Sequence, residues 1–273
     1  MIELPIYKAS AYSASDIVSG TIGLTDAQGK ELAELQAKDK RTEKQAERLV
    51  ELLDKQAKKE LPSGLKTHCE KWLKQKLYAR KKEFSSKFTE RGIFSEAEAL
   101  EFVSSELGIL LTKNDEYFEN DFFKGIPDVL PPTNYGIDLK CPWDCFTFPL
   151  FDKSIPDPAH YWQGQTYLDL FPEKEFWRFS YVLIDTPMHI IKGEANSWCR
   201  KNGEELTPEI MEQFVERYTY DGIDNRLRYR SFDVYRDEEA IKLLRSRVLV
   251  CREYIEQLVD EMYLSNNSQF VTN

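Results

Sequence analysis

Two aspartates and a lysine within one short stretch are the residues best suited to chemistry in this sequence. The stretch 125–140 reads GIPDVLPPTNYGIDLK and contains Asp128, Asp138 and Lys140. Side chains at positions i and i+2 of a strand point to the same face, so the apolar run around Asp138 should present Asp138 and Lys140 to one site. The Pro- and Gly-containing segment between the two aspartates should turn the chain back and bring Asp128 alongside.

Two carboxylates beside an ammonium group predict metal-assisted hydrolysis of a phosphodiester. Carboxylate and carbonyl oxygens are ligands that Mg²⁺ (or Mn²⁺) prefers, so we expect Asp128, Asp138 and the backbone carbonyl of Leu139 to hold one or two ions. A bound cation offsets phosphate charge and lowers the pKa of its water. Lys140 would orient that water or stabilise charge on the phosphate. The alternative, an exposed ion pair on an edge strand, is disfavoured by the apolar neighbours of Asp138 and Lys140.

Further candidate residues lie on predicted helices before and after this stretch. Glu96 belongs to a predicted helix over 94–103 and is a further candidate ligand, although Glu98 and Glu101 share its helix and any of the three could be solvated. Gln163 and Tyr167 are one helical turn apart and therefore share a face, where they could position a phosphate or the lysine–carboxylate cluster. We expect Glu96, Gln163 and Tyr167 to complete a catalytic set with the residues above.

These motifs together resemble the PD-(D/E)XK nuclease superfamily, and within it the phage-type exonucleases of the lambda exonuclease and YqaJ viral recombinase kind, with their RecB-nuclease relatives. The matching segments are Ser13-Ala-Ser15, Gly92-Ile-Phe-Ser-Glu96, Gly125-Ile-Pro-Asp128, Ile137-Asp-Leu-Lys140 and Gln163-Gly-Gln-Thr-Tyr167. The resemblance implies an α/β (α+β) fold with a restriction-endonuclease-like mixed sheet flanked by helices, and Mg²⁺-dependent DNA hydrolysis. No arginine lies in the Ser-Ala-Ser segment, so a 5′-phosphate clamp of the lambda kind is not expected.

The remaining pattern predicts the elements that position these residues. We expect a single nuclease domain over 1–273, with a helical arm at 25–64, a catalytic core at 92–185 and a mainly helical region at 186–264. The arm should contain two antiparallel helices with apolar positions at Leu32, Leu35, Leu49, Val50, Leu53 and Ala57. A basic helix should follow, with Leu65, Cys69, Trp72, Leu73 and Leu77 inward. Strands are expected at 109–113, 117–124, 135–141, 176–184 and 228–234, and helices around 160–167, 209–218 and 238–263.

Charge is distributed unevenly along the chain. The formal net charge is -10, which argues against a polyanionic substrate, yet residues 65–92 hold seven lysines and two arginines against three glutamates. One basic element on an acidic body is typical of a nucleic-acid groove, although a solvated lysine-rich helix face is an equal alternative. The predicted DNA contacts are Lys74, Lys76, Lys81 and Lys82, with Gln165 and, at a helix start that plain capping also explains, Ser13 and Ser15.

The function predicted from these features is a Mg²⁺-dependent exonuclease acting on double-stranded DNA ends in phage-type recombination or DNA processing. A nuclease-fold module that binds DNA or a protein without turnover, and a structure- or sequence-specific endonuclease, are the alternatives. A single-strand-annealing recombination partner and a homo-oligomer fit the resemblance. Scattered cysteines, the lack of an apolar N-terminal signal segment and the lack of a long apolar run predict a cytoplasmic protein of a bacterial or phage-infected cell, with no membrane partner.

Overall fold

The computed structural model describes residues 4–38, 40–58, 60–80 and 87–269, with the backbone alone at 58, 87–94 and 265–269. The chain divides into two compact units. The sheet unit comprises Ser10–Tyr12 and Lys82–Ile241, and the helical unit comprises Met1–Ala9, Ser13–Lys81 and Lys242–Asn273. The single nuclease domain over 1–273 stays a prediction.

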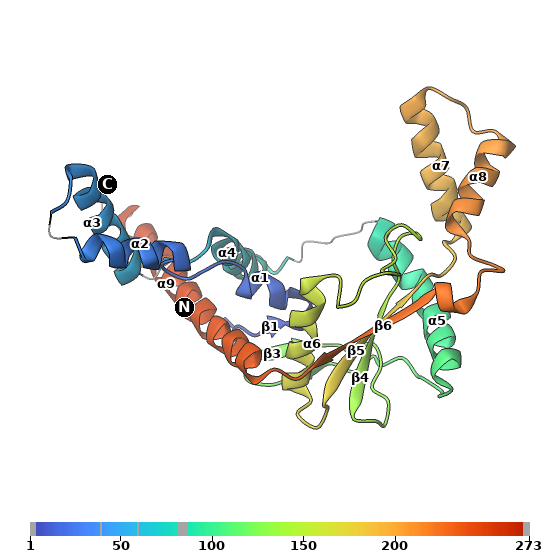
Figure 1. Ribbon diagram of the computed structural model, residues 1–273, viewed down its shortest axis with the longest axis horizontal. Coiled ribbons are helices and arrows are strands. Elements are labelled where there is room, and N and C mark those ends of the chain that lie inside the picture. The colour runs from blue at the N-terminus through green and yellow to red at the C-terminus, as the bar shows by residue number, and fades with distance from the viewer. Residues whose placement is uncertain (1–3, 39, 59, 81–86, 270–273) are drawn as a thin grey trace. The chain divides into compact units, whose positions relative to one another are not determined.

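The sheet unit is built on three strands with a helix on each face (Figure 1). Strands β4 (Tyr135–Lys140) and β5 (Phe176–Val182) are parallel, and β6 (Tyr229–Tyr235) is antiparallel to β5. Helix α6 (Pro158–Leu170) connects β4 to β5, and α5 (Lys87–Leu107) precedes the strands. This mixed sheet flanked by helices confirms the predicted fold class.

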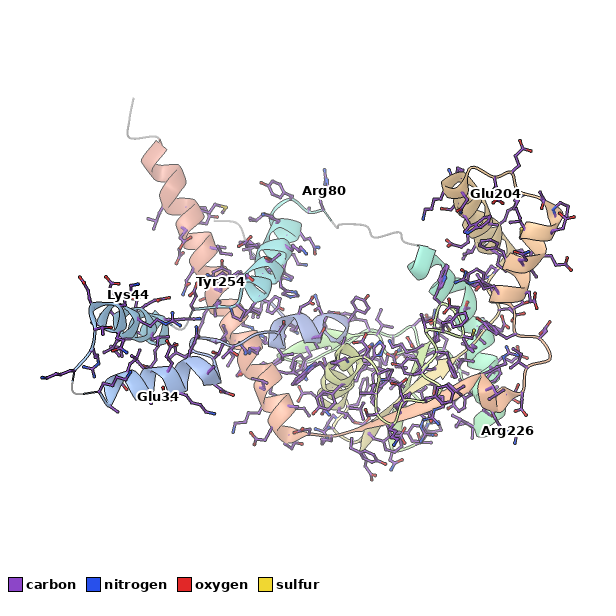
Figure 2. All side chains as sticks on the ribbon, turned by 45° about the horizontal axis from the view of Figure 1, so that its top comes forward. Glu34, Lys44, Arg80, Glu204, Arg226 and Tyr254 are labelled. Carbon is purple, nitrogen blue, oxygen red and sulfur yellow. The ribbon has the colours of Figure 1, made fainter. Side chains whose placement is uncertain are left out.

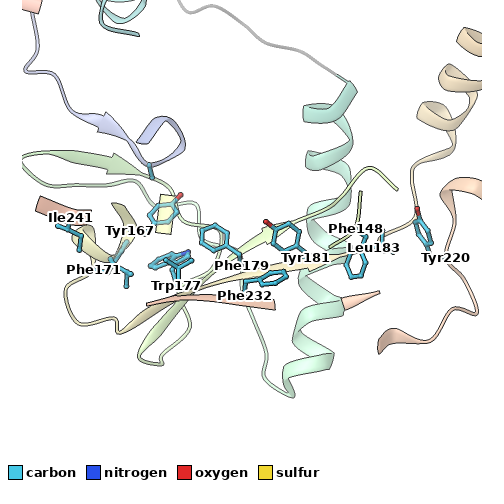
Figure 3. Close-up of a cluster of buried hydrophobic side chains, with 13 residues drawn as sticks. Phe148, Tyr167, Phe171, Trp177, Phe179, Tyr181, Leu183, Tyr220, Phe232 and Ile241 are labelled. Atoms are coloured by element: carbon cyan, nitrogen blue, oxygen red, sulfur yellow. The ribbon is translucent and has the colours of Figure 1, made fainter. Parts of the chain in front are cut away.

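Side-chain alternation along the strands divides the core into two layers. On one face, Trp177 and Phe179 of β5 pack with Tyr167 and Leu168 of α6 (Figure 3). On the other face, Ile137 of β4 packs with side chains of α5. Because neighbours along a strand point to opposite faces, the residues on either side of Ile137 and Leu139 must face α6. The strand therefore directs Asp138 and Lys140 toward that helix.

Gly136 of β4 is required by a close approach of an aromatic ring. A Cβ atom at this position would lie 2.3 Å from Cη2 of Trp177. Trp177 is fully buried, and its ring stacks on Tyr167 with the centroids 4.6 Å apart. The indole ring therefore has no room to withdraw from an added methyl group.

We expect Gly136→Ala to lower the free energy of unfolding by about 3 kcal/mol, because overpacking a filled core forces strain. The matched control is Gly193→Ala in an exposed helical position, where a Cβ atom would meet nothing within 4 Å and where alanine should stabilise the helix by up to about 1 kcal/mol. Urea denaturation of both variants measures the difference. Equal stability of the two variants would contradict the packing argument.

A second, smaller sheet has the order β1–β3–β2, with β1 at Ala9–Ser10, β2 at Phe118–Glu119 and β3 at Phe123–Gly125. The single strand predicted over 117–124 is wrong, because Asn120 Oδ1 accepts hydrogen bonds from the backbone N–H groups of Phe122 and Phe123 and closes a hairpin. The strand predicted over 109–113 is also wrong. In that segment Leu111 N–H donates to the Ser104 hydroxyl instead of a neighbouring strand.

Helices α7 (Met188–Asn202) and α8 (Pro208–Tyr218) and the short 3₁₀ helix η2 (Asn225–Leu227) lie between β5 and β6 in the chain. The segment between these two strands is therefore mainly helical, and the division into a core at 92–185 and a helical region at 186–264 stays a prediction. The strands predicted at 135–141, 176–184 and 228–234 are confirmed as β4, β5 and β6. In the described part of the chain, no helix combines the length and apolar character needed to cross a bilayer.

The helical unit contains α1 (Ala14–Val18), α2 (Asp26–Gln36), α3 (Glu43–Lys58), α4 (Ser63–Leu77) and most of α9 (Glu238–Gln269). Contacts of Arg48 with Glu31 and of Lys55 with Gln28 confirm that α2 and α3 are antiparallel. Glu34 of α2 and Lys44 of α3 are exposed, charged side chains of this pair (Figure 2).

The apolar positions noted in this helix pair do not all lie on its inner face. Val50 and Leu53 are 65% and 40% exposed, and Ala57 is exposed as well, whereas Leu52 is fully buried with Leu32 and Leu35. A run of apolar residues from Leu49 to Leu53 fits two neighbouring helix faces, so periodicity alone did not choose between them. In α4 the predicted inward residues Leu65, Cys69 and Leu73 are confirmed as buried.

Candidate active site

The structure brings Asp138 and Lys140 together on the α6 face of β4. Asp138 is 1% exposed, and its Oδ1 atom lies 2.6 Å from Nζ of Lys140. Asp138 is paired in register with Phe179 of β5, and the Lys140 ammonium lies 5.6 Å from the centre of that ring. Asp138 is therefore buried and Lys140 is half-buried, in contrast to the exposed edge-strand alternative.

Asp128 returns to the same place through backbone pairing. Val129 and Ile137 exchange two backbone hydrogen bonds of 3.1 Å, and this bridge folds the segment after Asp128 against β4. The Oδ2 atom of Asp128 accepts a hydrogen bond of 2.7 Å from the Leu139 N–H group. The expected turn between the two aspartates is therefore confirmed, as is their proximity.

The pKa of Asp128 is shifted because its carboxyl group is buried close to the carboxylate of Asp138. Burial, followed by the charge of Asp138, raises the pKa of Asp128 to about 8. The Leu139 N–H group and the Lys140 ammonium oppose that shift without overcoming it. Burial works to lower the pKa of Lys140, but the carboxylates of Asp138 and Asp128 outweigh it and hold that pKa above its usual value. The two carboxyl groups thus favour the protonated form of Lys140.

Gln163 and Tyr167 of α6 face the cluster, as predicted, but they have different tasks. Gln163 donates from Nε2 to Asp138 Oδ2 at 2.8 Å and accepts from Lys140 Nζ at 3.2 Å. Its amide therefore fixes both charged groups. Tyr167 donates to the backbone carbonyl of Ile126 at 3.1 Å and is 4% exposed. Tyr167 is a positioning residue for the segment that carries Asp128.

The donor set fits a divalent cation. Asp138 Oδ1 is buried, and its partner is the Lys140 ammonium 2.6 Å away. A buried carboxylate oxygen is stable only beside a cation or a donor, so this position favours positive charge. Asp128, Asp138 and the Leu139 carbonyl are the groups that would hold the ion. Over the ranges given above, no three carboxylate, imidazole or thiol groups converge, so the chain supplies two carboxylates and other oxygens would complete the shell.

Glu96 lies apart from these ligands. Its Oε2 atom is 2.7 Å from Nζ of Lys113, in an ion pair that sequence reasoning did not foresee. Glu96 is nevertheless close enough for its charge to contribute to the raised pKa of Asp128. Its role as a ligand stays a prediction, and it would require Lys113 to release the carboxylate.

The predicted DNA contacts have mixed outcomes. The prediction for Gln165 is wrong, because its side chain is fully buried, donates to the Tyr235 carbonyl at 2.7 Å and accepts from Asp237 N–H at 2.9 Å. Lys81 and Lys82 lie outside the described residues. Lys74 and Lys76 are exposed on α4, and their contact with DNA stays a prediction.

The two serines predicted as phosphate contacts begin a very short helix. Ser13 occupies the cap position of α1, but its side chain makes no capping hydrogen bond, and the helix has five residues. Ser15 lies within the same helix. Their contact with a phosphate stays a prediction.

Residues that sequence reasoning did not assign also line the site. A cavity of about 440 Å³ is bounded by the two aspartates, Lys140, Gln163 and Tyr167 together with Tyr12, Tyr117, Lys124 and Ile126. Tyr117, Lys124 and Ile126 belong to the hairpin that precedes Asp128, and Tyr12 follows β1. Only the pairing of the small sheet, which the sequence pattern did not reveal, brings them to the carboxylates.

His160 of α6 is a titratable ring next to this cluster. It stacks on Phe179 with the ring centroids 5.4 Å apart, and its Nδ1 atom lies 2.5 Å from the Tyr181 hydroxyl. Burial, followed by the charge of Lys140, lowers the pKa of His160 to about 4. The folded ring is therefore neutral where an unfolded histidine, with its usual pKa of 6.5, begins to take up a proton.

We expect the stability of the protein to fall as pH drops from 6.5 toward 4, because the unfolded chain binds a proton that folded His160 does not. The contribution of the neutral ring is complete above the unfolded pKa and should reach about 2 kcal/mol across this window. Urea denaturation from pH 4.5 to 7.5 measures it, with His160→Asn as the comparison. Identical pH dependence in the two proteins would contradict the assignment.

The chain was compared with known proteins. No family model matches it, and no curated protein does. Among solved structures, a phage-related exonuclease from Haemophilus somnus 129PT is similar with 22% identity and a TM-score of 0.68, over 94% of this chain and 97% of that one. An alkaline exonuclease from Laribacter hongkongensis, LHK-Exo, has 14% identity and a TM-score of 0.56, over 97% and 95% of the two chains. LHK-Exo in complex with dAMP has 15% identity and a TM-score of 0.54 over the same shares. The fold of this chain is therefore similar to the folds of these exonucleases.

Proposed function

We propose that this protein is a Mg²⁺- or Mn²⁺-dependent deoxyribonuclease that acts as an exonuclease on double-stranded DNA ends, in phage-type recombination or DNA processing. The observation that carries the proposal is the buried Asp138, whose carboxylate lies 2.6 Å from the Lys140 ammonium and close enough to Asp128 to raise the pKa of that group. A cluster of this kind is costly to build, and its composition matches the need of phosphodiester hydrolysis for cations around a phosphate.

The residues of the chain have distinct parts in the proposed reaction. A divalent ion held by Asp128, Asp138 and the Leu139 carbonyl would offset phosphate charge and lower the pKa of a bound water. Lys140 remains protonated, so it stabilises negative charge on the phosphoryl group and does not act as a base. Gln163 keeps the Lys140 ammonium and the Asp138 carboxylate in place through hydrogen bonds of 3.2 and 2.8 Å.

The similar structures support DNA as the substrate and the exonuclease mode. Two of them carry the description of an exonuclease, one phage-related and one alkaline. The second was also solved with dAMP, a deoxynucleoside monophosphate of the kind that hydrolysis from a DNA end releases. With the metal-compatible carboxylates of this chain, these likenesses favour an exonuclease over a fold that only binds DNA.

The deciding experiment is incubation of the protein with Mg²⁺ and an end-labelled linear duplex, with a covalently closed circle as the control. We expect release of mononucleotides from the linear duplex, no cutting of the circle, and full inhibition by EDTA. Cutting of the circle would replace the proposal with an endonuclease. Binding of the duplex without cutting, in either Mg²⁺ or Mn²⁺, would replace it with a binding module.

The basic segment provides a separate prediction about the DNA path. Reversal of Lys74, Lys76, Lys81 and Lys82 to Glu should weaken binding to all DNA sequences alike, because phosphate contacts carry no base information. The slope of log affinity against log salt should fall by roughly one for each contact removed. Fluorescence anisotropy over a salt series measures both quantities. An unchanged affinity and slope would show that this helix is only a solvated face.

A further inference from the structure

Exposed, largely apolar side chains surround the mouth of the cavity that contains the two aspartates. Tyr12 is 87% exposed, Tyr117 54% and Ile126 52%, and all three line the same cavity as Asp128 and Asp138. Among the described residues, neither tyrosine ring packs on another aromatic ring. Aromatic side chains left open beside a polar site are costly in water and are typical of ligand contacts.

The hairpin fixes one side of this mouth. The register of β2 and β3 pairs Phe118 with Gly125, so Tyr117 and Ile126 are opposite each other at the open end of the hairpin. The Tyr117 hydroxyl donates to Glu119 at 2.8 Å, and the carbonyl of Ile126 accepts the hydrogen bond from Tyr167. The Tyr117 hydroxyl and the backbone of Ile126 therefore have partners within the protein before any ligand arrives.

Tyr12 lies on the other side. The strand order places β1 on the opposite edge of β3 from β2, and Ala11 is so close to β3 that a Cβ atom on Gly125 would lie 3.2 Å from it. Tyr12 follows directly in the chain and lines the same cavity as Lys140. Tyr12 and Tyr117 thus flank the end of β3, next to the carboxylates.

The chemistry of the mouth differs from that of the floor of the cavity. Carboxylates and Lys140 on the floor suit a cation and a phosphate, whereas flat, uncharged rings at the mouth suit the apolar part of a nucleotide. We propose that Tyr12 and Tyr117, supported by Ile126, form a stacking rim for the nucleobase of the nucleotide whose phosphate lies at Asp128 and Asp138. The inference rests on the proposed function and adds the residues that hold the base.

Stacking predicts a particular pattern of substrate tolerance. Every base has a π-face, so such a rim should bind all four bases. Only a nucleotide without a base should bind more weakly. Removal of one aromatic contact should cost about 1 to 3 kcal/mol per base, which corresponds to a loss of affinity of roughly 5- to 150-fold. A hydrogen-bonding pocket would instead discriminate among the bases.

A binding cycle tests the rim without the need for turnover. The protein is titrated in Ca²⁺ in place of Mg²⁺, because Ca²⁺ takes the same kind of oxygen ligands and leaves Asp138 unaltered. Fluorescence anisotropy measures binding of duplexes whose terminal nucleotide is either normal or an abasic analogue, placed at the 5′ or the 3′ end. We expect Tyr12→Ala and Tyr117→Ala to weaken binding of the normal end about tenfold. For the abasic analogue at the end that occupies the site, the same changes should alter affinity less than twofold.

Two control variants isolate stacking from other effects. Tyr12→Phe retains the ring and should bind the normal end as Tyr12 does. Phe151→Ala removes an aromatic side chain that is 89% exposed but does not line the cavity, and it should leave binding unchanged. If Tyr12→Ala and Tyr117→Ala weaken binding of normal and abasic ends equally, or weaken neither, the proposed rim is wrong.

The rim and the proposed function fail in different experiments. Cleavage of a linear duplex by the unaltered protein tests the nuclease function alone. If the protein cleaves but the two tyrosine variants bind normal and abasic ends alike, the function stands and the rim is wrong. If the protein does not cleave but the cycle shows the expected base dependence, the rim stands on a protein that binds DNA ends without turnover.

Discussion

Asp138→Asn should reduce DNA cleavage to background while the protein remains folded. The substitution keeps the shape of the side chain but removes the charge of a buried carboxylate that we propose as a metal ligand. Bound metal contributes several kcal/mol to stabilisation of the transition state, so a loss of about 4 kcal/mol corresponds to roughly a thousandfold fall in rate. Single-turnover cleavage in saturating Mg²⁺ or Mn²⁺ measures the effect. Near-normal cleavage would show that Asp138 is not a metal ligand.

The free energy of unfolding of Asp138→Asn depends on two opposing interactions of Asp138, with Lys140 and with Asp128. Asp138→Asn removes the partner of Lys140 at 2.6 Å, but it also relieves the like charge that raises the pKa of Asp128. Because the two effects oppose each other, we expect the free energy of unfolding to change by less than about 2 kcal/mol.

Asp233→Asn is the control for loss of a carboxylate elsewhere in the sheet unit. Asp233 forms two hydrogen bonds of 2.7 Å with Arg178, away from the cavity. This variant should lose stability with little loss of cleavage. Loss of cleavage in both variants at the same level would point to damage of the sheet and not to a lost ligand.

The central part of the site could be predicted because it depends on local geometry. Alternation along β4 is enough to put Asp138 and Lys140 on one face, and the turn-forming segment before β4 is enough to return Asp128. Helical spacing gives Gln163 and Tyr167 a common face. These predictions require only the two-residue repeat of side chains along a strand, the repeat of about 3.6 residues along a helix, and one turn.

The remaining features depend on pairings that no local rule provides. Gln165 is two positions from Gln163, which is about 200° around a helix, so it faces β6 and not the site. The ion pair of Glu96 with Lys113 joins segments 17 residues apart. Tyr12 follows β1 and Tyr117 precedes β2. Both line the same cavity because β1 and β2 lie on either side of β3. Such contacts follow from tertiary packing, which periodicity in one segment does not specify.

Lys140→Ala should lower the turnover of cleavage about a hundredfold, as expected for the loss of a positioned charge that stabilises the transition state. Lys140 is a donor to Gln163 and a partner of Asp138, but it is not a metal ligand, so the affinity for Mg²⁺ should change by only a few-fold. Lys140→Met preserves the packing over Phe179 and should lose as much turnover as the alanine variant.

Isothermal titration of Mg²⁺ and single-turnover rates at saturating metal separate charge stabilisation by Lys140 from a structural role. Lys192→Ala, at an exposed position of α7, controls for removal of one positive charge. If Lys140→Ala loses metal binding but retains turnover when Mg²⁺ is raised to saturation, Lys140 serves only to hold the carboxylates. A rate that falls at saturating metal, with metal affinity preserved, is the result expected of an ammonium group that acts directly on the phosphate.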